Sequence, residues 1–104
     1  MTKKEVLESI KHAVLSAEPS ANVLLYGSRA RGDAVSQSDW DFLILVDGPV
    51  DEQRKRTLRH RLYEVEWDSG EVISSIILSR EEWNDSRHRT TPFYETVLHE
   101  GVTL

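Results

Sequence analysis

Two aspartates at the start of an apolar segment are the residues of this sequence best suited to chemistry. Asp39 and Asp41 open the stretch "DWDFLILV", residues 39 to 46. Side chains two positions apart in a strand point to the same face, so we expect the two carboxylates to converge and Trp40 to point into the core on the opposite side. Adjacent carboxylates repel one another unless a cation lies between them. Mg²⁺ takes a few carboxylate oxygens and completes its shell with water and phosphate oxygens, so the pair predicts a magnesium site, although Asp-x-Asp pairs also occur in turns and caps.

The loop in front of the aspartates contains residue types that bind phosphate. Glycines allow backbone conformations that other residues resist, and hydroxyl and guanidinium groups donate hydrogen bonds to phosphate oxygens. A strand that ends in Gly-Ser can also present backbone N–H groups to an anion. The predicted nucleotide-binding residues are Gly27, Ser28, Arg29, Arg31 and Ser38. Together with the carboxylate pair, they predict a site for a nucleoside triphosphate with Mg²⁺.

Short apolar strands alternate with amphipathic helices along the chain, and these elements must position the polar residues. We predict strands over 22–26, 41–46 and 71–78, and helices over 3–17, over 51–67, from 79 and from 92. Helices that alternate with short strands predict an α/β (α+β) fold, in which a small mixed sheet of three or four strands carries helices mainly on one face. A chain of 104 residues is close to the commonest domain size, which predicts a single domain over 1–104.

The order of residues in the loop resembles a known signature. The stretch "GSRARGDAVSQSDWD" contains Gly27-Ser28, ten residues, and then Asp39-x-Asp41. This pattern resembles the DNA polymerase β superfamily of nucleotidyltransferases, and the chain looks most like the minimal nucleotidyltransferase (MNT) domains over nearly its whole length. The resemblance implies that the chain has a polymerase β-like nucleotidyltransferase core.

The resemblance also implies roles for the matching residues. Gly27 and Ser28 would bind the triphosphate of ATP or another nucleoside triphosphate. Arg29 and Arg31 would lie against the phosphates or the acceptor. Asp39 and Asp41 would be the catalytic residues that hold Mg²⁺ or Mn²⁺, while an acceptor hydroxyl attacks the α-phosphorus and pyrophosphate leaves.

One expected acid is missing from the sequence. Members of the superfamily usually have a third carboxylate on the strand after the Asp-x-Asp strand, and that strand here reads "EVISSIIL", with Ser74 and Ser75 in its middle. A serine is a poor Mg²⁺ ligand and a far weaker base than a carboxylate. Glu71 is a possible further metal ligand, but an exposed charge at the strand's start is the simpler interpretation. Nucleotide binding is therefore better supported than turnover.

Charge and composition exclude several classes of function. The formal net charge of −5 argues against a general nucleic-acid coat, and we expect the basic run "RKRTLRHR" (54–61) to be the solvated face of a helix. There is no cysteine, which excludes disulfides and thiolate chemistry. The first residues mix charged with apolar positions, so we expect neither a signal peptide nor a membrane span, and a cytoplasmic protein. Trp67 and Trp83 are expected to close the core.

The resemblance suggests what the protein would act on. MNT domains commonly pair with HEPN-domain proteins as the antitoxin of a toxin–antitoxin module, so a HEPN-like partner protein or a second copy of the chain would complete the pocket. Two functions stay open from the sequence. One is an enzyme that transfers AMP to a hydroxyl, for which the resemblance suggests a side chain of the partner. The other is a nucleotide-binding module, catalytically impaired, that neutralises the partner by contact.

Overall fold

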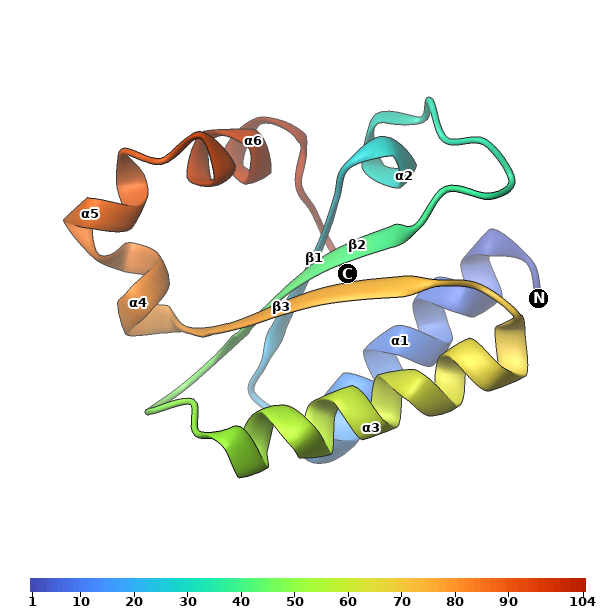
Figure 1. The fold of residues 1–104 in the computed structure, drawn as a ribbon, viewed down its shortest axis with the longest axis horizontal. Coiled ribbons are helices and arrows are strands. Elements are labelled where there is room, and N and C mark those ends of the chain that lie inside the picture. Colours follow the sequence, from blue (N-terminus) through green and yellow to red (C-terminus); the bar gives the residue numbers. More distant parts are fainter.

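The computed structural model describes all 104 residues, 1–104. In chain order, the elements are α1 (Lys3–Ala17), β1 (Asn22–Tyr26), α2 (Ser28–Arg31), β2 (Trp40–Val46), α3 (Glu52–Ser69), β3 (Ile73–Ser79), α4 (Arg80–Asn84), α5 (Ser86–Arg89), α6 (Pro92–Glu100) and β4 (Val102–Thr103). The strands form one mixed sheet in the order β3-β2-β1-β4 (Figure 1). β1 pairs antiparallel with β2 and β4, whereas β2 and β3 are parallel because α3 crosses between them.

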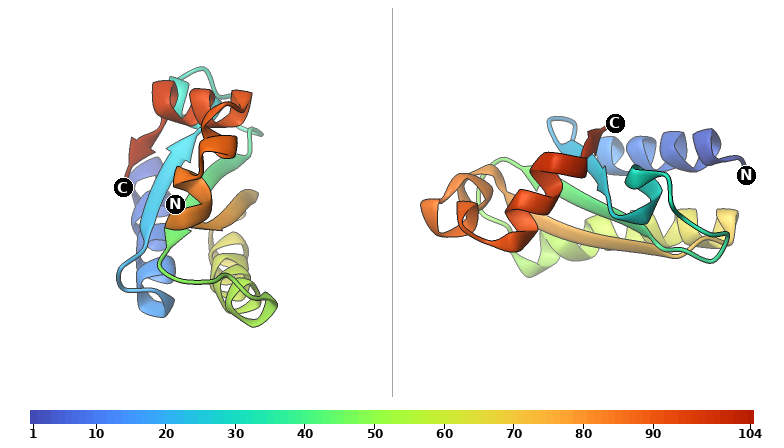
Figure 2. Two further views of the ribbon diagram at one scale, coloured as in Figure 1. Left: turned by 90° about the vertical axis from the view of Figure 1, so that its left-hand side faces the viewer. Right: turned by 90° about the horizontal axis from the view of Figure 1, so that it is seen from above.

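The larger part of the core lies between the sheet and the two long helices. α1 and α3 lie side by side across one face of the sheet (Figures 1 and 2). Each helix has an apolar stripe at helical spacing, and the alternate residues of β2 point toward these stripes. The buried residues of the two helices are Val6, Ile10, Ala13, Val14, Leu58, Leu62 and Val65. Full burial of one such aliphatic side chain of Val, Leu or Ile stabilises a fold by about 1.5–3 kcal/mol.

The opposite face of the sheet is covered in part by the short C-terminal helices. Leu43 and Leu45 of β2 pack there with Trp83 of α4 and Val97 of α6. Figure 2 shows the sheet between the pair α1 and α3 and these shorter helices. The α+β class and the mixed sheet are confirmed. The larger core cluster lies under α1 and α3, and on the opposite face α6 packs against β1.

Helix boundaries follow the capping residues. Thr2 caps α1 and Ser79 caps α4, each in a capping box with the glutamate three residues on. α6 begins after Thr91 with Pro92 in its first turn and ends at Gly101. None of the helices is long and apolar enough to span a bilayer.

The prediction for Trp67 was wrong, whereas Trp40 and Trp83 are buried. Trp67 is 74% exposed on the outward face of α3, where its ring makes an edge-to-face contact with Tyr63. The inward stripe of α3 includes Val65, and a residue two positions further along a helix points to the opposite side. Helical spacing therefore turns Trp67 to the surface.

Glu18, at the end of α1, forms an ion pair with Arg54 in the first turn of α3. This ion pair links the two long helices. Arg54 Nε and Nη2 donate to the two carboxylate oxygens of Glu18, each at 2.7 Å, and both side chains are partly buried. Hydrogen bonds from Arg54 lower the pKa of Glu18 below its usual value of 4.5. A carboxyl group whose pKa is lowered by folding stabilises the fold above its unfolded pKa and loses that effect as the pH falls through the folded pKa.

We therefore expect Glu18→Gln to lower the free energy of unfolding at neutral pH by about 1–2 kcal/mol, because a charge-assisted bidentate contact is replaced by a neutral one. Below the folded pKa of Glu18 the difference between variant and wild type should vanish, since both side chains are then neutral. Urea unfolding followed by circular dichroism at neutral and acidic pH measures both effects. Glu8→Gln, an exposed position of the same helix, is the matched control. Equal losses in the two variants would contradict this role of the ion pair.

Candidate functional site

The candidate site lies where the end of β1 meets the start of β2. Tyr26 pairs with Asp41 in the antiparallel register. Trp40 is buried among the residues packed against α1 and α3, so Asp41 points to the other face, as the alternation of a strand requires. Asp39 is exposed in the loop directly before β2, and its charge acts on Asp41.

Gly27 is the point of closest approach between the loop and the aspartates. Its φ of 78° lies in the left-handed region, and a Cβ at this position would lie 2.5 Å from Asp41 Oδ2. The Asp41 carboxylate therefore lies directly against the Gly27 backbone. Only glycine satisfies both the backbone conformation and the contact.

One short helical turn, α2, determines where the two arginines of the loop point. Gly27 O accepts hydrogen bonds from the N–H groups of Ala30 and Arg31, both at 3.0 Å, and Gly32 ends the turn with φ 86°. Residues two apart in a helix project roughly to opposite sides, about 200° around the axis. Arg29 and Arg31 consequently point to opposite faces of the sheet.

Arg31 lies on the face of the aspartates. It is half-exposed, its Nε donates to Asp33 at 3.1 Å, and its charge lowers the pKa of Asp41. Its Nη1 donates to both carboxylate oxygens of Glu100, each at 3.2 Å. Arg31 is therefore positioned beside the predicted metal ligands.

Glu100 is a residue of this site that the sequence did not indicate. Its Oε1 also accepts the N–H of Gly27 at 2.9 Å, and its charge is among those that raise the pKa of Asp41. It stands at the end of α6, and only the path of that helix across the sheet brings it to the loop. The segment "HEGVTL" around it resembles small members of the MNT family, but that resemblance assigns no role to Glu100.

Arg29 is not brought together with the aspartates. Its guanidinium is buried, lies 4.5 Å from the centroid of the Trp40 ring and donates to Ser38 O at 3.0 Å. These contacts brace the loop against the core from behind the site. Arg29 therefore positions the loop and does not face the aspartates, because its place in α2 turns it away from Asp41.

Glu71 also lies on the opposite side from the aspartates. It accepts a hydrogen bond from Trp40 Nε1 at 3.2 Å and lies 3.6 Å from Arg29. Glu71 precedes β3 by two positions, in phase with Ile73, which pairs with Trp40. Strand alternation thus directs Glu71 to the face of α1 and α3, away from the predicted metal position.

The two serines of the predicted phosphate loop, Ser28 and Ser38, lie in different surroundings. Ser38 Oγ accepts the N–H of Val35 at 3.0 Å and closes the loop on itself. Ser28, the first residue of α2, follows Gly27 directly and is partly buried. Of these two, Ser28 is the one adjacent to Gly27 and Arg31.

Ser74 is the residue of β3 that stands beside Asp41. The parallel register pairs Ser74 with Asp41 and Ser75 with Phe42. Phe42 is fully buried against the long helices, so Ser75 points into that side and Ser74 shares the face of Asp41. The position from which a third acid could reach the site is therefore occupied by Ser74.

The pKa of Asp41 is raised, first by burial and then by the neighbouring charge of Asp39, and Glu100 adds to this while Arg31 opposes it. Burial and Asp41 likewise raise the pKa of Tyr26. No cluster of three or more acidic or histidine side chains is arranged to hold a metal ion. Two carboxylates fit a cation such as Mg²⁺, which keeps water and substrate phosphates in its shell, rather than one enclosed by protein ligands.

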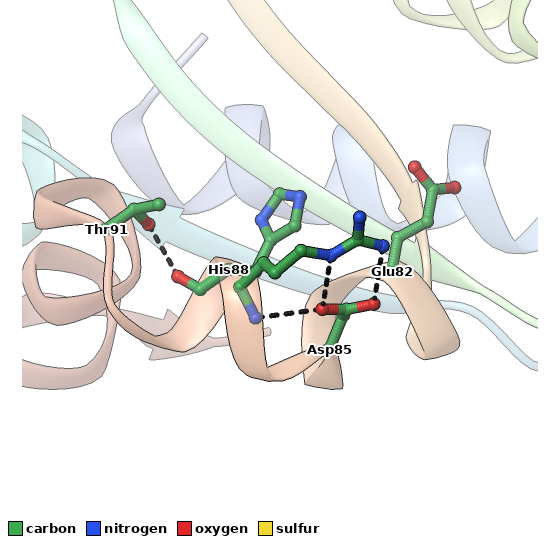
Figure 3. A pocket seen from close by; sticks show the side chains of 5 residues that line it. Glu82, Asp85, His88 and Thr91 are labelled. Carbon is green, nitrogen blue, oxygen red and sulfur yellow. Dashed lines mark hydrogen bonds and ion pairs between the residues drawn. The ribbon is translucent and has the colours of Figure 1, made fainter.

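A separate polar pocket of about 440 Å³ lies among the C-terminal helices, away from α2. Its lining residues are Glu82, Asp85, Arg87, His88 and Thr91 (Figure 3). Asp85 accepts hydrogen bonds from the side chain and the backbone of Arg87, and these lower its pKa to about 2. These contacts pair the charges of Asp85 and Arg87 with each other.

Comparison with known proteins agrees with this geometry. The sequence matches the family described as "Nucleotidyltransferase domain" over residues 5–99. The chain belongs to this nucleotidyltransferase family. The matched region contains the glycine turn and both aspartates of the nucleotidyltransferase domain, and it ends one residue before Glu100. A search of curated proteins finds no significant match.

Solved structures share the fold of this nucleotidyltransferase domain. One is a crystal structure of a toxin-antitoxin with AMP-PNP, which superposes with a TM-score of 0.66 at 16% identity over 92% of this chain and 69% of that chain. Another is a mutant of the toxin-antitoxin MntA-HpeT, with a TM-score of 0.60 at 14% identity over 99% of this chain and 72% of that chain. At such identities the likeness establishes the fold.

The contact of Gly27 with Asp41 can be tested with a double-mutant cycle. Gly27→Ala should lose about 1–3 kcal/mol of unfolding free energy to backbone strain, because φ 78° and ψ −160° lie in a region that only glycine adopts readily. It should lose at least about 1 kcal/mol more because the new Cβ overlaps the Asp41 carboxylate. Chemical unfolding of Gly27→Ala, Asp41→Ala and the double variant separates the two losses, since only the second depends on the carboxylate. An equal cost of Gly27→Ala with and without the Asp41 carboxylate would contradict this account.

Proposed function

We propose that this domain is a Mg²⁺-dependent nucleotidyltransferase that transfers a nucleoside monophosphate, AMP from ATP, to a hydroxyl acceptor. The convergence of the Gly27 turn, Arg31 and the two aspartates on one edge of the sheet is the observation that carries the proposal. It puts anion donors next to cation ligands, which is the arrangement that a metal-bound triphosphate needs.

Each residue of the site has a definite task in the proposed reaction. Arg31 and the backbone at Gly27 and Ser28 hold the phosphates, and Asp39 and Asp41 hold the cation, Mg²⁺ or Mn²⁺. The bound cation supplies neutralisation of the charge that develops on the phosphate oxygens. The acceptor hydroxyl loses its proton to solvent water as its oxygen forms a bond to the α-phosphorus. The bond from this phosphorus to the bridging oxygen breaks, and pyrophosphate leaves with that oxygen. The chain's own contribution is to position both reactants and to exclude competing geometries.

The acceptor is proposed to lie on a partner protein. Solved proteins of the same fold are toxin–antitoxin assemblies, and one of them was crystallised with AMP-PNP. These structures support an adenine nucleotide as ligand and a toxin as partner. The resemblance to MNT domains adds a HEPN-like partner, with a side-chain hydroxyl of that partner as the proposed acceptor. A second copy of the chain is the alternative source of the residues that complete the pocket.

Ser74 favours a second candidate function. Without a third carboxylate beside Asp41, no group on β3 can act as a base or hold a second cation. In this alternative, the domain is a catalytically impaired nucleotide-binding antitoxin that neutralises its partner by contact.

A transfer assay separates the two functions. With α-labelled ATP, Mg²⁺ and the HEPN-like partner, wild type should label the partner, and Asp39→Asn/Asp41→Asn should reduce the rate by about 100-fold or more, because the cation loses both ligands. Asp68→Asn, an exposed position on α3, should label at the wild-type rate. If the doubly substituted protein still neutralises the partner and no label is transferred by wild type, the contact mechanism holds and the transfer proposal fails.

The Ser74 position offers a gain-of-function test. Ser74→Asp places a third carboxylate in register with Asp41 and should tighten Mn²⁺ binding by on the order of tenfold, since affinity of hard cations rises with the number of charged oxygen ligands. Electron paramagnetic resonance of Mn²⁺ titrations measures the affinity without turnover. Ser74→Asn is the control, because asparagine has the shape of aspartate without its charge. Equal Mn²⁺ affinities of the two variants would show that Ser74 does not face the cation.

A further inference from the structure

Glu100 makes the contacts that a bound phosphate would make. Its carboxylate accepts the Gly27 N–H at 2.9 Å and the Arg31 guanidinium at 3.2 Å through both oxygens. The side chain is 17% exposed, so it is enclosed at the site rather than extended into solvent. An anion of the protein itself thus holds two of the donors proposed for the nucleotide.

We propose that Glu100 is an internal competitor of the nucleotide and sets its affinity, because the phosphates can bind Gly27 and Arg31 only when the Glu100 carboxylate has left them. The inference rests on the proposed function, since it takes the same donors as the phosphate site. It adds a residue outside the glycine turn and the aspartate pair to the determinants of substrate binding.

The Glu100 carboxylate and a phosphate cannot accept the Gly27 N–H at the same time. A backbone N–H is a single donor, and here it is used by Glu100 Oε1. Arg31 has further N–H groups, but its Nε is already engaged by Asp33. A phosphate at this position therefore replaces the carboxylate instead of adding to it.

Charge acts in the same direction as donor capacity. Glu100 adds to the negative charge around Asp41 and neutralises part of Arg31. A polyanionic substrate approaching this face meets repulsion from Glu100 that only its displacement removes. Both effects weaken phosphate binding while the Glu100 contacts persist.

The backbone around Glu100 is fixed, so only its side chain needs to move. The chain leaves α6 at Gly101 and enters β4, which pairs with β1 at Leu24 and Leu25. Figure 1 shows this descent from α6 beside β1 and α2, and Figure 2 shows it from above. Rotation about the side-chain bonds of Glu100 releases the donors without disturbing the sheet.

Titration calorimetry of Mg²⁺ with AMP-PNP tests the proposal without requiring turnover. Glu100→Gln, which has the same shape and no charge, should bind the nucleotide about tenfold more tightly than wild type, the factor expected when one charge-assisted contact no longer competes. Glu100→Ala is the second variant and should also bind more tightly. Glu95→Gln removes the same charge from an exposed position of α6 and should change the affinity less than about twofold. Thermal unfolding of each variant verifies that it is folded.

Titration with Mg²⁺ and inorganic tripolyphosphate tests which part of the nucleotide competes with Glu100. The gain in Glu100→Gln should persist with tripolyphosphate, which lacks the nucleoside, because the competition is for phosphate donors. Equal or weaker binding of both ligands in the Glu100 variants would overturn the inference, and weaker binding would assign Glu100 to the cation as a ligand instead. Absence of binding by every protein would overturn both this inference and the phosphate site. Tighter binding in Glu100→Gln together with no transfer in the labelling assay would leave this inference standing and remove only the proposed reaction.

Discussion

The antiparallel pairing of β1 with β2 is the constraint on which the site depends. Pairing Tyr26 with Asp41 puts the next residue, Gly27, against the Asp41 carboxylate. A shift of one residue would turn Asp41 toward the core and Phe42 outward, which burial of Phe42 against the long helices forbids. The hydrophobic pattern of β2 therefore fixes the position of a polar group on its other face.

The same separation of faces organises the residues around the aspartates. On one side of the sheet, Arg29, Trp40 and Glu71 form a largely buried cluster that braces the loop against the core. On the other side, Arg31 and Gly27 lie beside Asp41 and donate to the Glu100 carboxylate. A site built this way has its polar groups on short, supported elements, which keeps their geometry within narrow limits.

Much of this arrangement follows from the sequence because it depends on local patterns. Strand alternation predicts that Trp40 is buried opposite Asp41, and the capping residues Thr2 and Ser79 predict where α1 and α4 begin. What the sequence could not provide depends on packing between distant segments. The path of α6 decides that Glu100 reaches the loop.

Side-chain direction within short elements is the second part that local patterns did not resolve. Both arginines of the loop were expected to lie against the phosphates or the acceptor, but one turn of helix directs Arg29 to the core side and leaves Arg31 on the face of Asp41. Trp67 was expected to close the core, although its position on α3 faces outward. In each case the phase of the helix outweighs the chemical type of the residue.

The electrostatic balance of the site explains why an internal anion is compatible with a nucleotide site. Without a ligand, the Arg31 guanidinium and the Gly27 N–H would be poorly paired in a partly buried position, which costs free energy for each group. Glu100 satisfies them, but it also adds negative charge beside Asp41, which raises the pKa of that carboxyl. A phosphate that arrives with a cation offers the same donors an equivalent partner, while the cation relieves the repulsion between the aspartates. When a phosphate replaces the Glu100 carboxylate, one anion replaces another and Arg31 stays paired. The free-energy difference of this exchange is therefore smaller than the free energy of either contact alone. Glu100 would thus tune the affinity of the site instead of closing it.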